Sequence, residues 1–167
     1  MITKEMILAG ISAGVVKLVD SPYGNEPSCR IGEHWFYYAE SGAEGMSSAE
    51  YVARTPLDRI AVRITGALEG IRDDLDGADE YCYYEAVLNE AGVPDLVKAE
   101  NVRRNPPRPD IQVIITVAKN ADSVGGGAAI LGSDGVWYWT YNGEKTDKVP
   151  YSVTGWTYIE DYREVEK

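Results

Sequence analysis

Residues 92–110, with the sequence GVPDLVKAENVRRNPPRPD, constrain the fold more than any other stretch of this 167-residue chain. Four prolines stand in it, and a proline inside a helix or a central strand removes a backbone hydrogen bond. We therefore expect little long regular structure there, with NPPRP extended and at most one helical turn in DLVKAE. The stretch 93–110 is predicted to link two lobes, residues 1–92 and residues 111–167.

Capping residues predict helices in the first lobe. Thr3 is a suitable N-cap for a first helix that ends near residue 14. Ser47 and Glu50 form a capping box that opens a short second helix. Thr55 as the cap and Pro56 as the first helical residue are expected to begin a third helix.

Apolar spacing supports this third helix and predicts a fourth. The third carries an apolar stripe at steps of three and four residues: Leu57, Ile60, Ala61, Ile64, Ala67, Leu68 and Ile71. The segment DLDG (74–77) interrupts the pattern. A fourth helix over about 78–91 would place four apolar or aromatic residues on one face: Tyr81, Tyr84, Leu88 and Ala91.

The first lobe is also predicted to hold a small sheet. Residues 15–20 have the composition of a strand, and 29–40 that of two extended pieces around Gly32 and Glu33. Turn-forming residues fill 21–28 between them.

The second lobe is predicted to be an antiparallel sheet. Residues 111–117 suit a central strand because they are almost all β-branched. A hairpin of 128–131 and 136–142 and one or two strands within 151–162 follow, and 120–127 is expected to be a loop. The predicted fold class is therefore α+β.

The net charge of −11 is unevenly distributed. Residues 1–92 carry 16 Asp and Glu against 7 Lys and Arg, a net of −9, whereas residues 93–167 carry 11 against 9, a net of −2. An acidic lobe repels nucleic acids and anionic membranes and attracts basic protein surfaces or cations. With only two cysteines and neither a signal peptide nor a membrane-spanning segment in view, we expect a cytoplasmic protein.

The residues argue against the common enzyme and metal sites. One histidine and two distant cysteines lack zinc-site spacing, and GGGAAILG (125–132) lacks the pattern of a phosphate loop. In an EF-hand alignment with Gly77 sixth, Arg72 and Tyr83 would occupy ligand positions. Cys29 and His34 could form a nucleophile–base pair across a turn, but such residues more often only pack. Paired-carboxylate catalysis needs a cleft, which a solvated turn does not supply. We predict no enzyme activity and no cofactor.

Residues 72–92 hold the densest group of acids in the chain. One interpretation is a solvated turn whose acids favour the start of the next helix. The other is a surface for a basic partner, in which carboxylates occupy a groove lined by Lys and Arg. The predicted contacts of that surface, with Tyr83 as an anchor, are Asp73, Asp74, Asp76, Asp79, Glu80, Tyr83 and Glu85.

Aromatic residues alternate along two strands of the second lobe. They are Trp137, Trp139, Tyr141, Trp156 and Tyr158. A sheet ordinarily buries such residues as core. If exposed, they would form a stacking platform for a nucleotide or sugar, a partner-binding patch or a homodimer interface. A small-ligand binding protein is therefore the alternative function.

Three segments, TKEMILAGISAGVVKLVDSPYG, CRIGEHWFYY and DEYCYYEAVL, lie within the first 92 residues. In these the chain resembles short acidic proteins carried by prophages and mobile elements of Gram-positive bacteria. The resemblance implies an inhibitor of host defence, such as an anti-CRISPR protein that mimics DNA and so inhibits a CRISPR or restriction nuclease. It implies no individual site residue.

Overall fold

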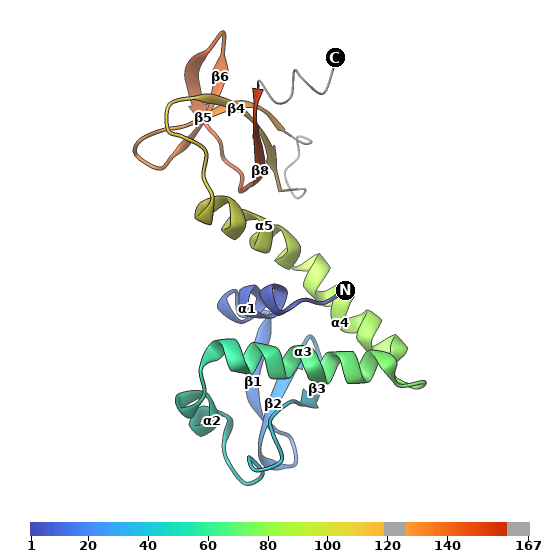
Figure 1. Cartoon of the computed structure of the whole chain (residues 1–167). Coiled ribbons are helices and arrows are strands. Elements are labelled where there is room, and N and C mark those ends of the chain that lie inside the picture. The colour runs from blue at the N-terminus through green and yellow to red at the C-terminus, as the bar shows by residue number, and fades with distance from the viewer. Residues whose placement is uncertain (119–125, 160–167) are drawn as a thin grey trace. The chain divides into compact units, whose positions relative to one another are not determined.

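The computed structural model describes residues 1–118 and 126–159 and shows an α+β fold with two antiparallel sheets, which confirms the predicted fold class (Figure 1). Contacts between Cα atoms divide the chain into unit 1, Met1–Pro94, and unit 2, Asp95–Lys167. Across the described ranges, every helix is too short or too polar to traverse a bilayer.

Unit 1 contains a three-stranded sheet of order β1-β2-β3. The strands are β1 (Val16–Ser21), β2 (Gly24–Ile31) and β3 (His34–Tyr37). The hairpin around Gly32 and Glu33 is confirmed, and Gly32 has the positive φ of +65° that favours glycine. A turn does lie within 21–28, at residues 22 and 23, but it is shorter than expected because β2 already begins at Gly24. Residues 27–29 are buried there, so tertiary packing overrides their turn propensity.

Four helices complete unit 1. They are α1 (Lys4–Ser12), α2 (Ser48–Arg54), α3 (Leu57–Asp73) and α4 (Ala78–Glu90). The hydroxyl of Thr3 accepts a bond from the Met6 N–H, and that of Ser47 from the Glu50 N–H, so both predicted caps are confirmed. Thr55 is not the cap of α3; it closes α2, and Pro56 occupies the N-cap of α3.

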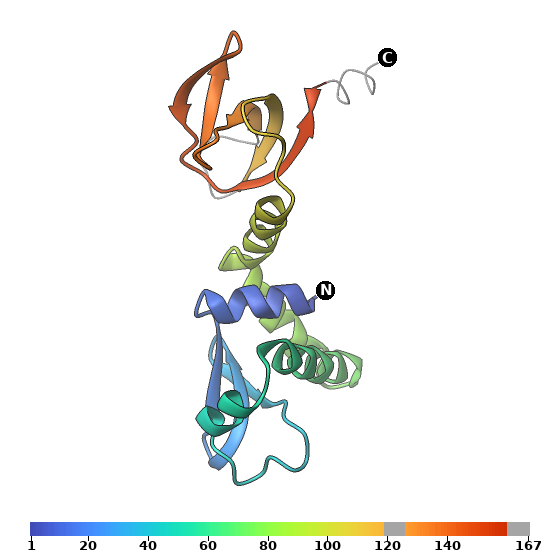
Figure 2. The ribbon, with the colours of Figure 1, turned by 60° about the vertical axis from the view of Figure 1, so that its left-hand side comes forward.

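The core of unit 1 lies between the sheet and the apolar helix faces. Figure 2 shows the sheet on one side of the unit and α3 and α4 on the other. The predicted faces of α3 and α4 supply the buried residues Ile60, Ala61, Ile64, Leu68, Tyr81, Tyr84 and Leu88. Leu57, expected in the stripe, is 46% exposed because it opens the first turn of α3.

The expectation of little regular structure over 92–110 is wrong. Helix α5 runs over Val93–Arg104, and the division between the two units falls within it, after Pro94. Pro94 is tolerated because it lies in the first helical turn, where a backbone N–H has no partner within the helix. The other three prolines of the stretch 92–110 all follow the end of α5.

Unit 2 contains a five-stranded sheet of order β7-β6-β5-β4-β8. The strands are β4 (Gln112–Val117), β5 (Gly126–Leu131), β6 (Trp137–Tyr141), β7 (Glu144–Lys148) and β8 (Val153–Tyr158). As predicted, β4 is flanked on both sides and β5 pairs with β6 as a hairpin. Strand β7 has no recognisable strand pattern in the sequence, because all five of its residues are exposed and none is apolar.

Parts of two predicted segments of unit 2 lie outside the described residues. These are 120–125 of the expected loop and 160–162 of the expected last strand. Residues 126 and 127, also assigned to the loop, belong to β5. The core of unit 2 consists of Val113, Ile115, Val117, Ala129 and Val153.

Candidate functional site

The turn between α3 and α4 has a fixed backbone geometry. The Asp74 N–H donates to the carbonyl of Ile71 at 3.3 Å and ends α3. Asp74 Oδ1 accepts the Asp76 N–H at 3.2 Å, and its carbonyl accepts the Gly77 N–H at 3.1 Å. A side chain at Gly77 would collide with the Ile71 carbonyl, so only glycine fits there. These bonds and Gly77 define the backbone path of the turn.

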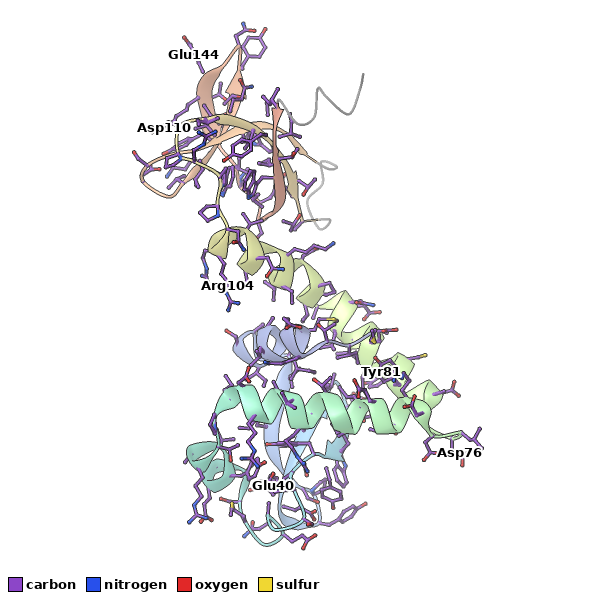
Figure 3. The ribbon with its side chains drawn as sticks, viewed as in Figure 1. Glu40, Asp76, Tyr81, Arg104, Asp110 and Glu144 are labelled. Atoms are coloured by element: carbon purple, nitrogen blue, oxygen red, sulfur yellow. The ribbon has the colours of Figure 1, made fainter. Side chains whose placement is uncertain are left out.

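This turn presents acidic side chains around an apolar one. Leu75 is 99% exposed, and the aspartates on both sides of it are exposed as well. Figure 3 shows Asp76 at the end of the turn, pointing away from the rest of unit 1. We call this surface the acidic tip; its residues are Asp73, Asp74, Leu75, Asp76 and Asp79.

Few cations neutralise the acidic tip. Arg72 Nε lies 3.1 Å from Asp73 Oδ1. The side chains of Asp76 and Asp79 have no hydrogen-bond or ion-pair partner within the part of the chain that the structure describes. The other arginines of this helical region, Arg54, Arg59 and Arg63, lie beside Glu50 and Glu40 instead.

Two predicted contact residues, Glu80 and Glu85, have partners inside unit 1. Glu80 accepts a 2.6 Å hydrogen bond from the Tyr84 hydroxyl and lies 3.9 Å from Nδ1 of His34. Burial of Tyr84, followed by this bond to Glu80, raises the pKa of the phenol, so it remains a donor. Glu85 lies 2.7 Å from the amino group of Met1. Both carboxylates therefore join elements of unit 1.

Tyr83, the predicted anchor, is also engaged within unit 1. Its ring stacks on His34 with centroids 4.2 Å apart, and its hydroxyl accepts the Glu33 N–H at 2.9 Å. The hydroxyl lies so close to Gly32 that a side chain there would overlap it. Tyr83 thus fastens α4 to the β2–β3 hairpin.

Cys29 and His34 do not face each other as a catalytic pair. Cys29 lies opposite Phe36, and His34 lies opposite Ile31. Cys29 is fully buried, and this desolvation raises the pKa of its thiol and disfavours the nucleophilic thiolate. Among the described residues no group of three or more His, Cys, Asp or Glu side chains is arranged to hold a metal ion.

The aromatic residues of unit 2 are not one open row. Trp137, Trp139, Trp156 and Tyr158 pack, partly buried, against the core of that unit. Trp156 Nε1 also donates to the Asn105 carbonyl at 2.8 Å. Tyr141, by contrast, is 74% exposed. The ligand platform stays a prediction, which quenching of tryptophan fluorescence by nucleotides or sugars would test.

Comparisons with protein-family models, with curated proteins and with solved structures each found no match to this chain. The acidic tip is the candidate site that the geometry favours. The sequence identified its four aspartates but not Leu75, although a leucine set among aspartates in a helix break is a visible signal of exposure.

Proposed function

We propose that this chain is a non-enzymatic interaction protein that binds a basic, nucleic-acid-handling partner through the acidic tip. One observation carries the proposal: a fully exposed leucine stands among four aspartates, two of which have no partner in the described structure. Carboxylates without internal partners retain their attraction for Lys and Arg on another protein.

The two kinds of side chain in the tip have separate roles in this proposal. The aspartates attract a positively charged groove over a distance set by the ionic strength, which speeds association. Leu75 enters an apolar recess of the partner and loses its water shell there, which slows dissociation. The fixed backbone of the turn lowers the entropy lost on binding.

The resemblance to prophage proteins supports a defence nuclease, such as a CRISPR or restriction enzyme, as the partner. Such an enzyme has a groove lined with Lys and Arg for the phosphates of its DNA. The tip would compete with DNA for that groove. Glu80, Tyr83 and Glu85, predicted as direct contacts, would instead support the tip by fastening α4.

Pull-down from a bacterial lysate tests the proposal at about 0.05 M and about 0.3 M NaCl, because salt screens exposed charges. Wild type should retain a nucleic-acid-handling protein at the lower salt concentration and lose most of it at the higher. The variant Asp74→Lys, Asp76→Lys, Asp79→Lys should lose it at both concentrations, and Leu75→Ala should bind more weakly.

A matched control changes the net charge equally at exposed acids elsewhere in unit 1: Glu5→Lys, Glu44→Lys, Glu90→Lys. The control should bind almost as wild type does, because the tip is intact. Equal loss with both triple variants would show that overall charge, not the tip, drives capture. Retention that neither salt nor the tip variant changes would refute the proposal.

A further inference from the structure

Unit 1 has a pocket of about 320 Å³ away from the acidic tip. The loop after β3, the end of α2 and the start of α3 surround it. It is lined by Glu40, Gly42, Ala43, Met46, Tyr51, Arg54, Thr55, Pro56 and Arg59. We call it the Glu40 pocket; Figure 3 labels Glu40.

Backbone turns shape one wall of the Glu40 pocket. The Ala43 N–H donates to the Glu40 carbonyl at 3.0 Å, and the Met46 N–H donates to the Ala43 carbonyl at 3.1 Å. Ala43 is only 3% exposed, so it anchors the loop in the protein. Because the loop is bonded to itself in this way, the pocket is largely formed before any ligand arrives.

Glu40 is held in place as an ionised group. The Tyr51 hydroxyl donates to Glu40 Oε2 at 2.5 Å, and Arg63 Nε lies 3.8 Å from the same oxygen. The bond from Tyr51 is the largest cause that lowers the pKa of Glu40, and the arginines add to it. Burial and the bond to Glu40 raise the pKa of Tyr51, so Tyr51 stays neutral. The carboxylate therefore has a fixed position and charge.

Arg54 and Arg59 have guanidinium donors left over. Each side chain is 65% exposed. Their nearest carboxylate contacts are 3.7 Å to Glu50 and 3.9 Å to Glu40, and neither guanidinium makes a hydrogen bond to any described residue. Two arginines against one glutamate make this lining locally positive, within a unit whose net charge is −9.

We infer that the Glu40 pocket binds a small organic anion, a phosphate monoester or carboxylate that also carries hydroxyl groups. A guanidinium matches the two oxygens of such an anionic group with parallel hydrogen bonds. Glu40 accepts a bond from a ligand hydroxyl, and Met46 and Pro56 contact the ligand's carbon skeleton. The volume, near the lower limit for ligand pockets, suits a ligand of a few carbons better than a nucleoside triphosphate.

The first turn of α3 assists this recognition. Pro56, the N-cap of α3, makes no side-chain hydrogen bond to the helix. The acid of the first turn, Asp58, lies 2.5 Å from Lys4, so the N-terminal N–H groups of α3 lack a capping oxygen beside the two arginines. A serine or aspartate in that place would have supplied its own oxygen to these N–H groups. The pocket thus lacks the internal acceptor that such a helix start ordinarily has.

Titration of the full chain, followed by amide NMR spectra, tests the inference. The probes are inorganic phosphate, ribose 5-phosphate, glycerate and ribose. Ribose 5-phosphate should shift the amides of Ala43, Met46 and Arg59 and bind about tenfold more tightly than inorganic phosphate, because its hydroxyls reach Glu40. Glycerate binding tighter than ribose 5-phosphate would identify the carboxylate class; the reverse would identify the phosphate class. Ribose alone should not bind.

Variants distinguish specific binding in the Glu40 pocket from nonspecific electrostatic attraction of anions. Arg59→Gln should weaken ribose 5-phosphate binding at least about tenfold, because it removes a charge-assisted pair of hydrogen bonds. Arg30→Gln, at an exposed arginine of β2, is the matched control and should bind as wild type does. Glu40→Gln keeps an acceptor for Tyr51 but removes the negative charge, so its affinity for inorganic phosphate should rise.

The inference is overturned if no anionic probe shifts the pocket amides, or if Arg59→Gln and Arg30→Gln behave alike. A fall in phosphate affinity for Glu40→Gln also contradicts it. The lysine variant of the acidic tip should retain anion binding in the Glu40 pocket. Failure of this inference and failure of the proposed protein interaction are therefore distinguishable.

Discussion

Two regions of unit 1, the Glu40 pocket and the acidic tip, use their carboxylates in opposite ways. Glu40 accepts a hydrogen bond from Tyr51 and has Arg59 and Arg63 within 4 Å. Asp76 and Asp79, in the tip, have no such partner among the described residues. Both regions flank α3, one at its start and one at its end.

The difference between the two regions shows that the net charge of a unit does not reveal where its unpaired charges lie. Three arginines of unit 1, Arg54, Arg59 and Arg63, lie beside Glu40 and Glu50, whereas among the described residues Arg72 alone lies beside an aspartate at the far end of α3. Removing the hydrogen bond to Glu40 should therefore lower the stability of unit 1, whereas neutralising the aspartates of the acidic tip should leave the stability nearly unchanged.

The largest expected effect concerns α3, which lies between the two regions. Ile64 is fully buried, so Ile64→Ala should lower the free energy of unfolding by about 3 kcal/mol through lost burial and the cavity it leaves. Leu75→Ala, at a 99% exposed position, should change it by less than about 0.5 kcal/mol. Urea unfolding followed by far-ultraviolet circular dichroism measures both. Equal losses would mean that Leu75 packs against the protein in solution.

The hydrogen bond to Glu40 should have the next largest effect. Tyr51→Phe removes the donor and should destabilise unit 1 by about 1–2 kcal/mol. Asp76→Asn is the comparison in the tip and should be close to neutral. Thermal unfolding of the two variants measures the difference, and a neutral Tyr51→Phe would contradict the structural role given to Glu40.

Tyr38→Phe should change the free energy of unfolding in the opposite direction to Tyr51→Phe. Tyr38 is 3% exposed, and its hydroxyl has no hydrogen-bond partner within the described structure. Removing an unsatisfied buried hydroxyl should stabilise unit 1 by about 1 kcal/mol. Tyr51→Phe is the matched control, because the Tyr51 ring packs edge to face against the Tyr38 ring, with the ring centroids 5.8 Å apart, but its hydroxyl has a hydrogen-bond partner. A lower melting temperature for Tyr38→Phe would show that its hydroxyl has a partner in solution.

The loss of stability at acidic pH should reveal a smaller difference between the two regions than the substitutions above do. The hydrogen bond from Tyr51 and the nearby arginines lower the pKa of folded Glu40 below that of an unfolded glutamate. Its stabilisation is thus complete above the unfolded pKa and is lost as pH falls through the folded one. Because Glu40 is 41% exposed, water screens this effect and keeps it small. Unfolding of Glu40→Gln between pH 6 and pH 3 should show a shallower loss than wild type.

The smallest effect is expected from neutralising the tip. Asp74→Asn, Asp76→Asn, Asp79→Asn should alter the free energy of unfolding by about 0.5 kcal/mol or less, because the amide at residue 74 still accepts the Asp76 N–H bond and the other two have no partner. Denaturant titration checks this. A large loss would show that the tip stabilises the fold.

Local rules predicted the parts of the fold that local interactions determine. Thr3 and Ser47 cap helices within a few residues of themselves, and the apolar face of α3 has a regular spacing. The predicted N-cap of α3, Thr55, lies one residue before the observed N-cap, Pro56, because Thr55 closes α2. Strand β7 has no apolar alternation, since its side chains all face solvent.

The site was harder to predict because long-range partners decide it. Glu80 and Tyr83 meet His34 and Glu33, about fifty residues earlier in the sequence, and Glu85 meets Met1. None of these pairings has a local sequence signal. The aspartates at 73–79 are exposed, as predicted. Within the described structure only Asp73 has an arginine beside it, Arg72, because Arg54, Arg59 and Arg63 lie beside Glu50 and Glu40.

The contact between Tyr83 and Gly32 has a consequence for how this sequence can change during evolution. Any side chain at residue 32 would displace the Tyr83 hydroxyl and also strain the hairpin. Loss of Tyr83 would in turn leave the Glu33 N–H without its acceptor. Homologous chains that keep this hairpin should therefore have glycine and tyrosine together at these two positions, or replace both. This pair of residues would identify homologues better than a high content of acidic residues does.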